Sequence, residues 1–169
     1  MRLLKNMAFA GLMTLGAFSA VTYTSCNKDE CKDVECQNGG TCSGGNCVCP
    51  SGYEGTSCET LSIVKFAKTW TASDQTGSTN LVYSVVIVPG SAVGTAIIAN
   101  EFSDELFFNS IDATVDKNVI TIPDQKPDVN GDYRVEGEGV YQANGSIVWN
   151  YTITRISTNE LQIYTGVWN

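Results

Sequence analysis

The chain has 169 residues, a formal net charge of −8 at neutral pH, seven cysteines and no histidine. An acidic field repels nucleic acid and anionic lipid headgroups, so we expect neither as a partner. Without histidine the chain lacks the commonest general base and metal ligand, and no Ser–His or Cys–His catalytic pair can form. The composition therefore points away from nucleic-acid binding and from the common hydrolytic mechanisms.

Residues 1–25 have the pattern of a secretory signal. Arg2 and Lys5 precede an uncharged apolar run over residues 7–21. This run of 15 residues is shorter than the about 20 residues that a helix needs to span a bilayer. We therefore predict that residues 1–25 form a signal peptide that contributes nothing to the mature fold.

Cys26 follows the small residues Thr24 and Ser25, and this junction resembles a bacterial lipobox, although Tyr23 occupies the position that usually holds Leu or Val. The resemblance implies that Cys26 carries fatty acyl chains and becomes the mature N-terminus. Two or three acyl chains anchor a protein stably in a membrane, whereas one does so only marginally. A free thiol or an intermolecular disulfide at Cys26 is the alternative.

The acidic stretch Asn27-Lys28-Asp29-Glu30 supports two interpretations. After a lipidated cysteine it resembles the signals that place lipoproteins on the outer face of some Gram-negative bacteria. The oxygen ligands of Asn27, Asp29 and Glu30 could instead hold calcium, as they do in one class of EGF-like module. That calcium signature also requires an Asp or Asn and an aromatic residue between the third and fourth cysteines of the module. The segment of residues 43–46 is too short to carry both, so we favour the surface address.

The other six cysteines fall at spacings that indicate a small disulfide-stapled module. The segments "CQNGGTC" (36–42) and "CVCPSGYEGTSC" (47–58) resemble an epidermal-growth-factor-like (EGF-like) domain. Spacing alone leaves 15 possible pairings open. The resemblance implies the pairs Cys31–Cys42, Cys36–Cys47 and Cys49–Cys58.

The chain after residue 62 contains no cysteine and shows period-two alternation between turn signals. Asn144-Gly145 is a strong hairpin signal, and another turn is expected around Asp116-Lys117-Asn118. The alternation predicts about eight strands at residues 63–71, 81–88, 94–100, 111–115, 118–123, 133–141, 147–154 and 161–167. We expect a mostly β chain with three segments: signal peptide 1–25, EGF-like domain 27–59 and β-domain 62–169.

Sequential hairpins favour an antiparallel meander closed into a barrel, with a β-sandwich as the alternative. Gly137 and Gly139 fit a strand that bends sharply at a barrel corner. An early Trp70 and an aromatic last strand are similar to lipocalin-like (calycin) barrels, although Lys68-Thr69-Trp70 stands where lipocalins have Gly-x-Trp. The resemblance implies a cavity for a small apolar ligand.

Candidate catalytic chemistry in this domain is limited to Glu136 and Glu138. Two positions apart on one strand face, they are separated by about 6.5–7 Å, a spacing that glycoside hydrolases also use. Arg134 shares their polar face, so solvated surface charge is the simpler interpretation. The domain's aromatic residues could instead line a pocket for carbohydrate or an apolar ligand: Trp70, Tyr133, Tyr141, Trp149, Tyr151, Tyr164 and Trp168.

These observations predict a non-enzymatic lipoprotein on the surface of the bacterial outer membrane, without a cofactor, that binds an unidentified protein, carbohydrate or small apolar ligand. A lipocalin-like carrier is the first alternative. A carbohydrate-active hydrolase is the second.

Overall fold

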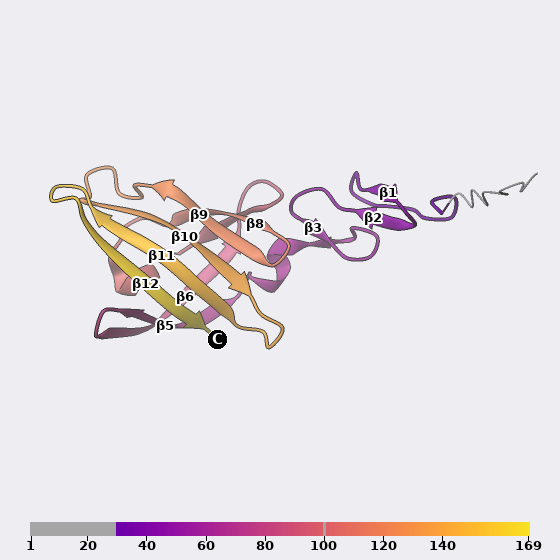
Figure 1. The fold of residues 1–169 in the computed structure, drawn as a ribbon. Helices are drawn as coiled ribbons and strands as arrows, with labels where there is room; N and C mark the ends of the chain where they lie inside the picture. Colours follow the sequence, from indigo (N-terminus) through magenta and orange to yellow (C-terminus); the bar gives the residue numbers. More distant parts are fainter. Residues whose placement is uncertain (1–29, 100) are drawn as a thin grey trace, which may run out of the picture.

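A module of short strands precedes a closed eight-stranded barrel in the computed structural model, which describes residues 30–99 and 101–169 (Figure 1). The chain is mostly β, as the alternation predicts. The described residues contain two helical segments, each a single turn: the 3₁₀ helix η1 (Ser62–Lys65) and the helix α1 (Phe102–Glu105). No helix in these residues is long and apolar enough to cross a bilayer.

Disulfides hold the N-terminal module together in place of a hydrophobic core. The bonds join Cys31 to Cys42, Cys36 to Cys47 and Cys49 to Cys58, which are the pairs that the EGF-like resemblance implies. Each such crosslink stabilises a small domain by about 2–4 kcal/mol. The strands are short: β1 (Thr41–Ser43) pairs with β2 (Asn46–Val48), and β3 (Tyr53–Glu54) pairs with β4 (Thr60–Leu61).

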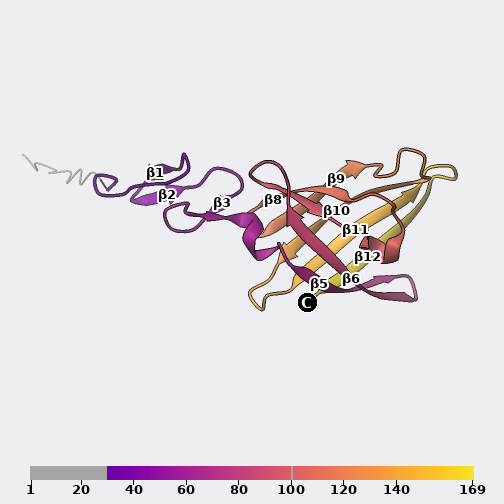
Figure 2. The same cartoon turned by 180° about the vertical axis from the view of Figure 1, so that it is seen from behind.

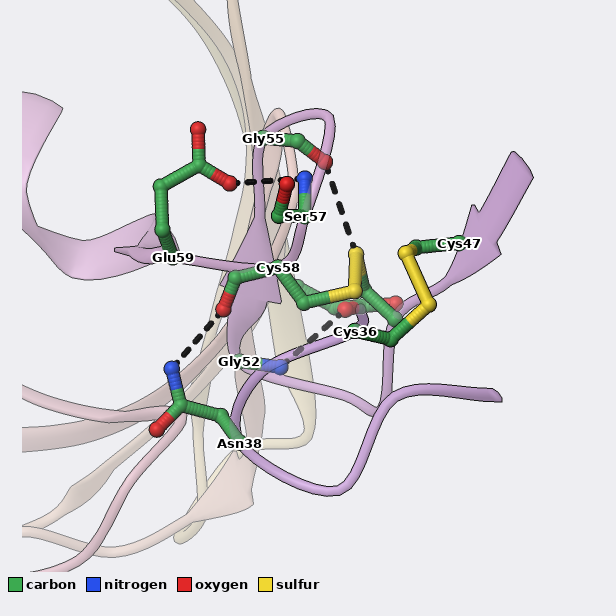
Figure 3. Close-up of a disulfide and its surroundings, with 10 residues drawn as sticks. Cys36, Asn38, Cys47, Gly52, Gly55, Ser57, Cys58 and Glu59 are labelled. Atoms are coloured by element: carbon green, nitrogen blue, oxygen red, sulfur yellow. Dashed lines mark hydrogen bonds between the residues drawn. A yellow bond between two sulfur atoms is a disulfide. The ribbon is translucent and has the colours of Figure 1, made fainter. Parts of the chain in front are cut away.

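Side-chain hydrogen bonds fasten the end of the module around its last disulfide (Figure 3). The Asn38 amide donates to the carbonyl of Cys58 at 2.8 Å, and the Ser57 N–H donates to the Glu59 carboxylate at 2.8 Å. The backbone hydrogen bonds at Glu59 and Ser57 lower the pKa of Glu59. The chain therefore leaves the module in a defined direction.

The barrel consists of consecutive antiparallel strands. They are β5 (Thr69–Thr76), β6 (Thr79–Pro89), β7 (Thr95–Ile98), β8 (Ile111–Asp116), β9 (Val119–Gln125), β10 (Tyr133–Tyr141), β11 (Ile147–Arg155) and β12 (Glu160–Trp168). The order β10-β11-β12-β5-β6-β7-β8-β9 closes on itself. The sandwich alternative is therefore wrong. Both expected hairpin turns are present, joining β8 to β9 and β10 to β11.

The first expected strand, at residues 63–71, is wrong in its bounds. Residues 62–65 form η1, whose Ile63 is buried together with the following Phe66 at the end of the barrel nearest the module. The strand itself continues to Thr76 through the polar stretch Ser73-Asp74-Gln75. Alternation hides this continuation because Asp74 occupies an inward position that is normally apolar.

Aromatic side chains fill the barrel interior. Trp149, Tyr151 and Trp168 are at most 2% exposed, and the Phe102 ring from α1 contacts all three, with its centroid 4.8 Å from that of Tyr151. Space for these rings comes from the neighbouring strand β10: a Cβ on Gly137 would lie 2.3 Å from that of Tyr151. The inward glycines thus make room for aromatic rings, and the register shift next to Gly137 adds the bend that the sequence predicts.

The module packs on one end of the barrel through the turn between β8 and β9 (Figure 2). The Gly52 N–H donates to the Asp116 carboxylate at 3.2 Å, and the Lys117 N–H donates to the Ser62 hydroxyl at 3.1 Å. Lys65 bridges the two parts, donating to Glu54 at 2.5 Å and to the Asn118 side chain at 2.6 Å. The opposite end, which we call the distal end, carries the loop between β11 and β12 (Figure 1).

Candidate ligand-binding cleft at the distal end

A cleft of about 210 Å³ opens at the distal end of the barrel. Three strands and the segment after α1 supply its walls. The lining residues are Leu106, Tyr133, Ile153, Arg155, Glu160, Gln162 and Tyr164. The lining residues of β10, β11 and β12 lie at the distal ends of these strands, and the EGF-like module is at the other end of the barrel (Figure 2).

The position of the cleft follows from the strand alternation. On β12, Trp168, Gly166 and Tyr164 are buried, and Gln162 and Glu160 continue the same face. Strand β5 pairs with β12 only between Thr165 and Trp168, so the distal half of β12 extends past its neighbour. Because side chains two apart share a face, the inward face becomes a polar wall where the core ends.

Arg155 is held by two neighbours. Its Nη2 donates to the Tyr133 hydroxyl at 2.8 Å, and its Nε lies 3.7 Å from the Asp132 carboxylate. The guanidinium carbon also lies 5.4 Å from the centre of the Tyr133 ring. The hydrogen bond to Tyr133 raises the pKa of Arg155. The guanidinium is thus pre-positioned in the wall of the cleft.

Asp132 fastens the loop that follows Arg155. Its carboxylate accepts hydrogen bonds from the Ser157 hydroxyl at 2.5 Å and from the Ser157 N–H at 2.9 Å. These bonds lower the pKa of Asp132, with the hydroxyl as the largest cause. The rim of the cleft is therefore ordered by a carboxylate that remains ionised at neutral pH.

Tyr164 connects the cleft to the core. Its ring stacks on Tyr151 at 4.7 Å between centroids with an interplanar angle of 4°, and its hydroxyl donates to the Gln162 amide oxygen at 2.8 Å. Burial raises the pKa of Tyr164, so the phenol is neutral at physiological pH. The Gln162 side chain is therefore oriented with its NH₂ group free of this bond and available to a ligand.

The barrel interior contains a buried carboxylate, Asp74 on β5, which is 0% exposed. It accepts hydrogen bonds from the hydroxyls of Tyr83 (2.5 Å) and Tyr151 (2.7 Å) and from the Trp168 indole (2.9 Å). Burial, together with the nearby Asp74 charge, raises the pKa of both tyrosines, so both stay protonated as donors. This network fixes Tyr151, on which Tyr164 stacks.

A second hollow at the distal end, of about 300 Å³, lies beside two highly exposed apolar side chains, Phe108 (88% exposed) and Val129 (84%). The buried Asp128 carboxylate accepts hydrogen bonds from the N–H groups of Phe108 and Asn109 and from the Asn109 amide. These bonds hold the loop before β8 against the loop between β9 and β10, and Phe108 and Val129 are exposed to solvent on these two loops.

The residues predicted as sites occupy different places. Glu136 and Glu138 are exposed on the outer face of β10, and Arg134 pairs with Asp124 instead of with them. They do not line the cleft. Of the possible calcium ligands, Glu30 is exposed, whereas Asn27 and Asp29, like the lipidation site Cys26, lie outside the described residues.

Among the predicted aromatic residues, only Tyr133 and Tyr164 line the cleft, and the others pack in the interior. Sequence reasoning missed Arg155, Glu160 and Gln162. The available signal was their register, because each continues the inward face of a strand beyond its last apolar residue.

Residues 26–58 match the family model of the EGF-like domain. A search of curated proteins finds no match. A solved structure from Bacteroides ovatus, titled as a structural genomics protein of unknown function, aligns with 12% identity and a TM-score of 0.41. The alignment covers 60% of this chain and 40% of that one, so this chain spans less than half of the other protein's length.

Proposed function

We propose that the protein is a non-enzymatic, lipid-anchored surface protein that binds a partner through its distal cleft. An EGF-like module joined to a β-barrel fits a role in binding or adhesion. The observation that supports the proposal best is the arrangement along the molecule. The module is at one end of the barrel (Figure 1), and the residues that line the cleft belong to the distal ends of β10, β11 and β12. An anchor ahead of the module would direct the cleft away from the membrane.

The cysteine inventory supports the anchor. Six cysteines form the three disulfides, which leaves Cys26 as the seventh. It follows the apolar run 7–21 and the small residues before it, where acylation of a thiol would place the lipid next to the membrane. The stretch of residues 27–30, which includes Asp29 and Glu30, would then serve as the address for the outer face of the bacterial outer membrane.

Metabolic labelling with an alkyne fatty acid tests the anchor. The parent chain and a control, Ser43→Ala, should incorporate the label, whereas Cys26→Ala should not. Equal labelling of Cys26→Ala would end the lipoprotein proposal. Protease treatment of intact cells should remove the barrel, and complete protection would place the protein on the inner side of the membrane.

Site-specific photocrosslinking tests the role of the cleft. A benzophenone amino acid at the exposed Glu160 position, in the cleft wall, should give a discrete adduct on intact cells, because benzophenone reacts with C–H bonds of any ligand class. The same group at Val82, which is 63% exposed on the barrel flank, serves as the matched control. Identical adducts from both positions, or none from position 160, would contradict binding at the cleft.

The structure favours neither alternative function. A carrier needs space inside the barrel, and Phe102 occupies the interior between Trp149, Tyr151 and Trp168. A hydrolase acting through Glu136 and Glu138 needs both carboxylates in one cleft. Both are exposed on the outer face of β10, and Glu136 lines a surface hollow that Glu138 does not line.

A further inference from the structure

The walls of the distal cleft offer hydrogen-bond donors and acceptors in close alternation. Arg155 donates, Glu160 accepts, Gln162 can do both, and the phenol hydroxyls of Tyr133 and Tyr164 add two more groups. An apolar ligand would bury these groups without partners, at a cost that rises with each one. The cleft chemistry therefore calls for a ligand that is itself rich in both donors and acceptors.

Acidic groups outnumber basic groups around Arg155 in the cleft. Arg155 stands directly opposite Glu160 in the β11–β12 register, and the Asp132 carboxylate lies 3.7 Å from its Nε. The chain as a whole carries −8. A phosphate, sulfate or carboxylate ligand would meet two acidic groups around one arginine in an acidic field, so an anion is disfavoured.

The size of the cleft limits what it can hold. At about 210 Å³ it is smaller than the about 300–1,000 Å³ of sites that enclose a complete small molecule. It therefore accommodates one ring of a larger molecule. The rings of Tyr133 and Tyr164 and the side chain of Leu106 provide apolar contact for carbon atoms between the polar groups.

We propose, building on the proposed binding function, that the cleft binds the terminal sugar of an uncharged glycan. A pyranose ring presents hydroxyls that donate and accept on its edge and C–H groups on its faces, which matches the alternating walls. The Gln162 amide, oriented by the Tyr164 hydroxyl at 2.8 Å, and the Arg155 guanidinium, held by Tyr133, are the groups that hydrogen-bond the sugar.

Binding of the full-length protein to an array of oligosaccharides tests the proposal. The array carries neutral termini and, as comparison, sialic acid and uronic acid termini. We expect binding to one or more neutral termini and at least tenfold weaker binding by Gln162→Ala, since one of the two groups proposed to hydrogen-bond the sugar is removed. Tyr164→Phe keeps the ring stack on Tyr151 but frees the Gln162 amide to rotate, and should weaken binding by a smaller factor. Gln75→Ala, an exposed glutamine on β5, is the matched control and should bind like the parent chain.

Three results would overturn the inference: no glycan bound, preference for the acidic termini, or equal loss in Gln162→Ala and Gln75→Ala. The photocrosslink from position 160 distinguishes failure of the glycan proposal from failure of the proposed binding function. A protease-sensitive adduct together with an empty array would mean that the cleft binds a protein, which refutes the glycan and retains the binding function. An empty array without any adduct would refute both.

Discussion

Replacing Asp74 by asparagine tests whether the buried carboxylate holds the barrel together. The carboxylate accepts three hydrogen bonds with both of its oxygens, from Tyr83, Tyr151 and Trp168. Asparagine has one acceptor oxygen, so its NH₂ group must face at least one of these donors. One buried donor then loses its partner, at about 1–3 kcal/mol, and the remaining bonds lose the assistance of a full charge.

We therefore expect Asp74→Asn to lower the free energy of unfolding by about 2–4 kcal/mol. Small domains are stable by about 5–15 kcal/mol, so this variant should still fold, whereas Asp74→Ala would leave three donors unpaired. Urea unfolding followed by tryptophan fluorescence measures the change. Tyr151→Phe, which removes one donor and keeps the carboxylate, should cost less.

A result within about 0.5 kcal/mol of the parent chain, or a gain in stability, would refute this reasoning. It would mean that the free-energy cost of burying the carboxylate charge cancels the stabilisation from its hydrogen bonds, as happens for some buried ion pairs. Gly166→Ala gives an independent check, because the added Cβ would lie within 1.8 Å of the Asp74 Oδ1. It should also destabilise the barrel.

Three further predictions concern the module and the rim of the cleft. Gly52→Ala should detach the module without unfolding the barrel, because the φ angle of Gly52 is +85° and a Cβ there would lie 2.8 Å from the backbone N of Gly94. Faster proteolysis after residue 58, with an unchanged melting temperature of the barrel, would show this. An unchanged cleavage rate would contradict it. A reductant should unfold residues 31–58 and leave the β signal of the barrel in circular dichroism, and loss of that signal would argue against two separately stabilised parts. The pKa of Asp132 is lowered, so its hydrogen bonds to Ser157 are present at pH values above the ordinary pKa of 3.8 and are lost as the pH falls through the lower pKa of the folded state. An NMR titration of the Ser157 amide should have its midpoint below pH 3.8. A midpoint at or above pH 3.8 would contradict the hydrogen bonds.

The sequence was sufficient for most of the fold because hydrophobic alternation reports directly on which strand face is buried. It predicted the β10–β11 hairpin from Asn144-Gly145 and the barrel from consecutive strands. It misplaced the end of β5 because Asp74 breaks the alternation. The burial of this carboxylate is explained only by its hydrogen-bond donors on β6, β11 and β12, which the sequence of β5 does not reveal.

The cleft was less predictable for a related reason. Tyr133 and Tyr164 stood out as aromatic residues, but Arg155 and Gln162 look like ordinary solvated positions near a turn. Their role depends on β12 extending past the end of β5, an offset between paired strands that alternation within one strand does not encode. Glu136 and Glu138 stood out for their spacing, but both lie on the outer face of β10 and do not share a cleft.

The disulfide pattern also determines how the molecule carries mechanical tension. A pull on the chain ahead of Cys31 crosses to Cys42, follows the backbone to Cys49 and crosses to Cys58. The loop 50–57, which contacts the β8–β9 turn, is bypassed and stays unloaded. Force then reaches η1, whose Ser62 and Lys65 are bonded to the β8–β9 turn, and after it β5, which is joined to β6 by eight residue pairs. A partner held at the far end of the barrel would therefore pull along the strands, the direction in which a β-sheet yields last.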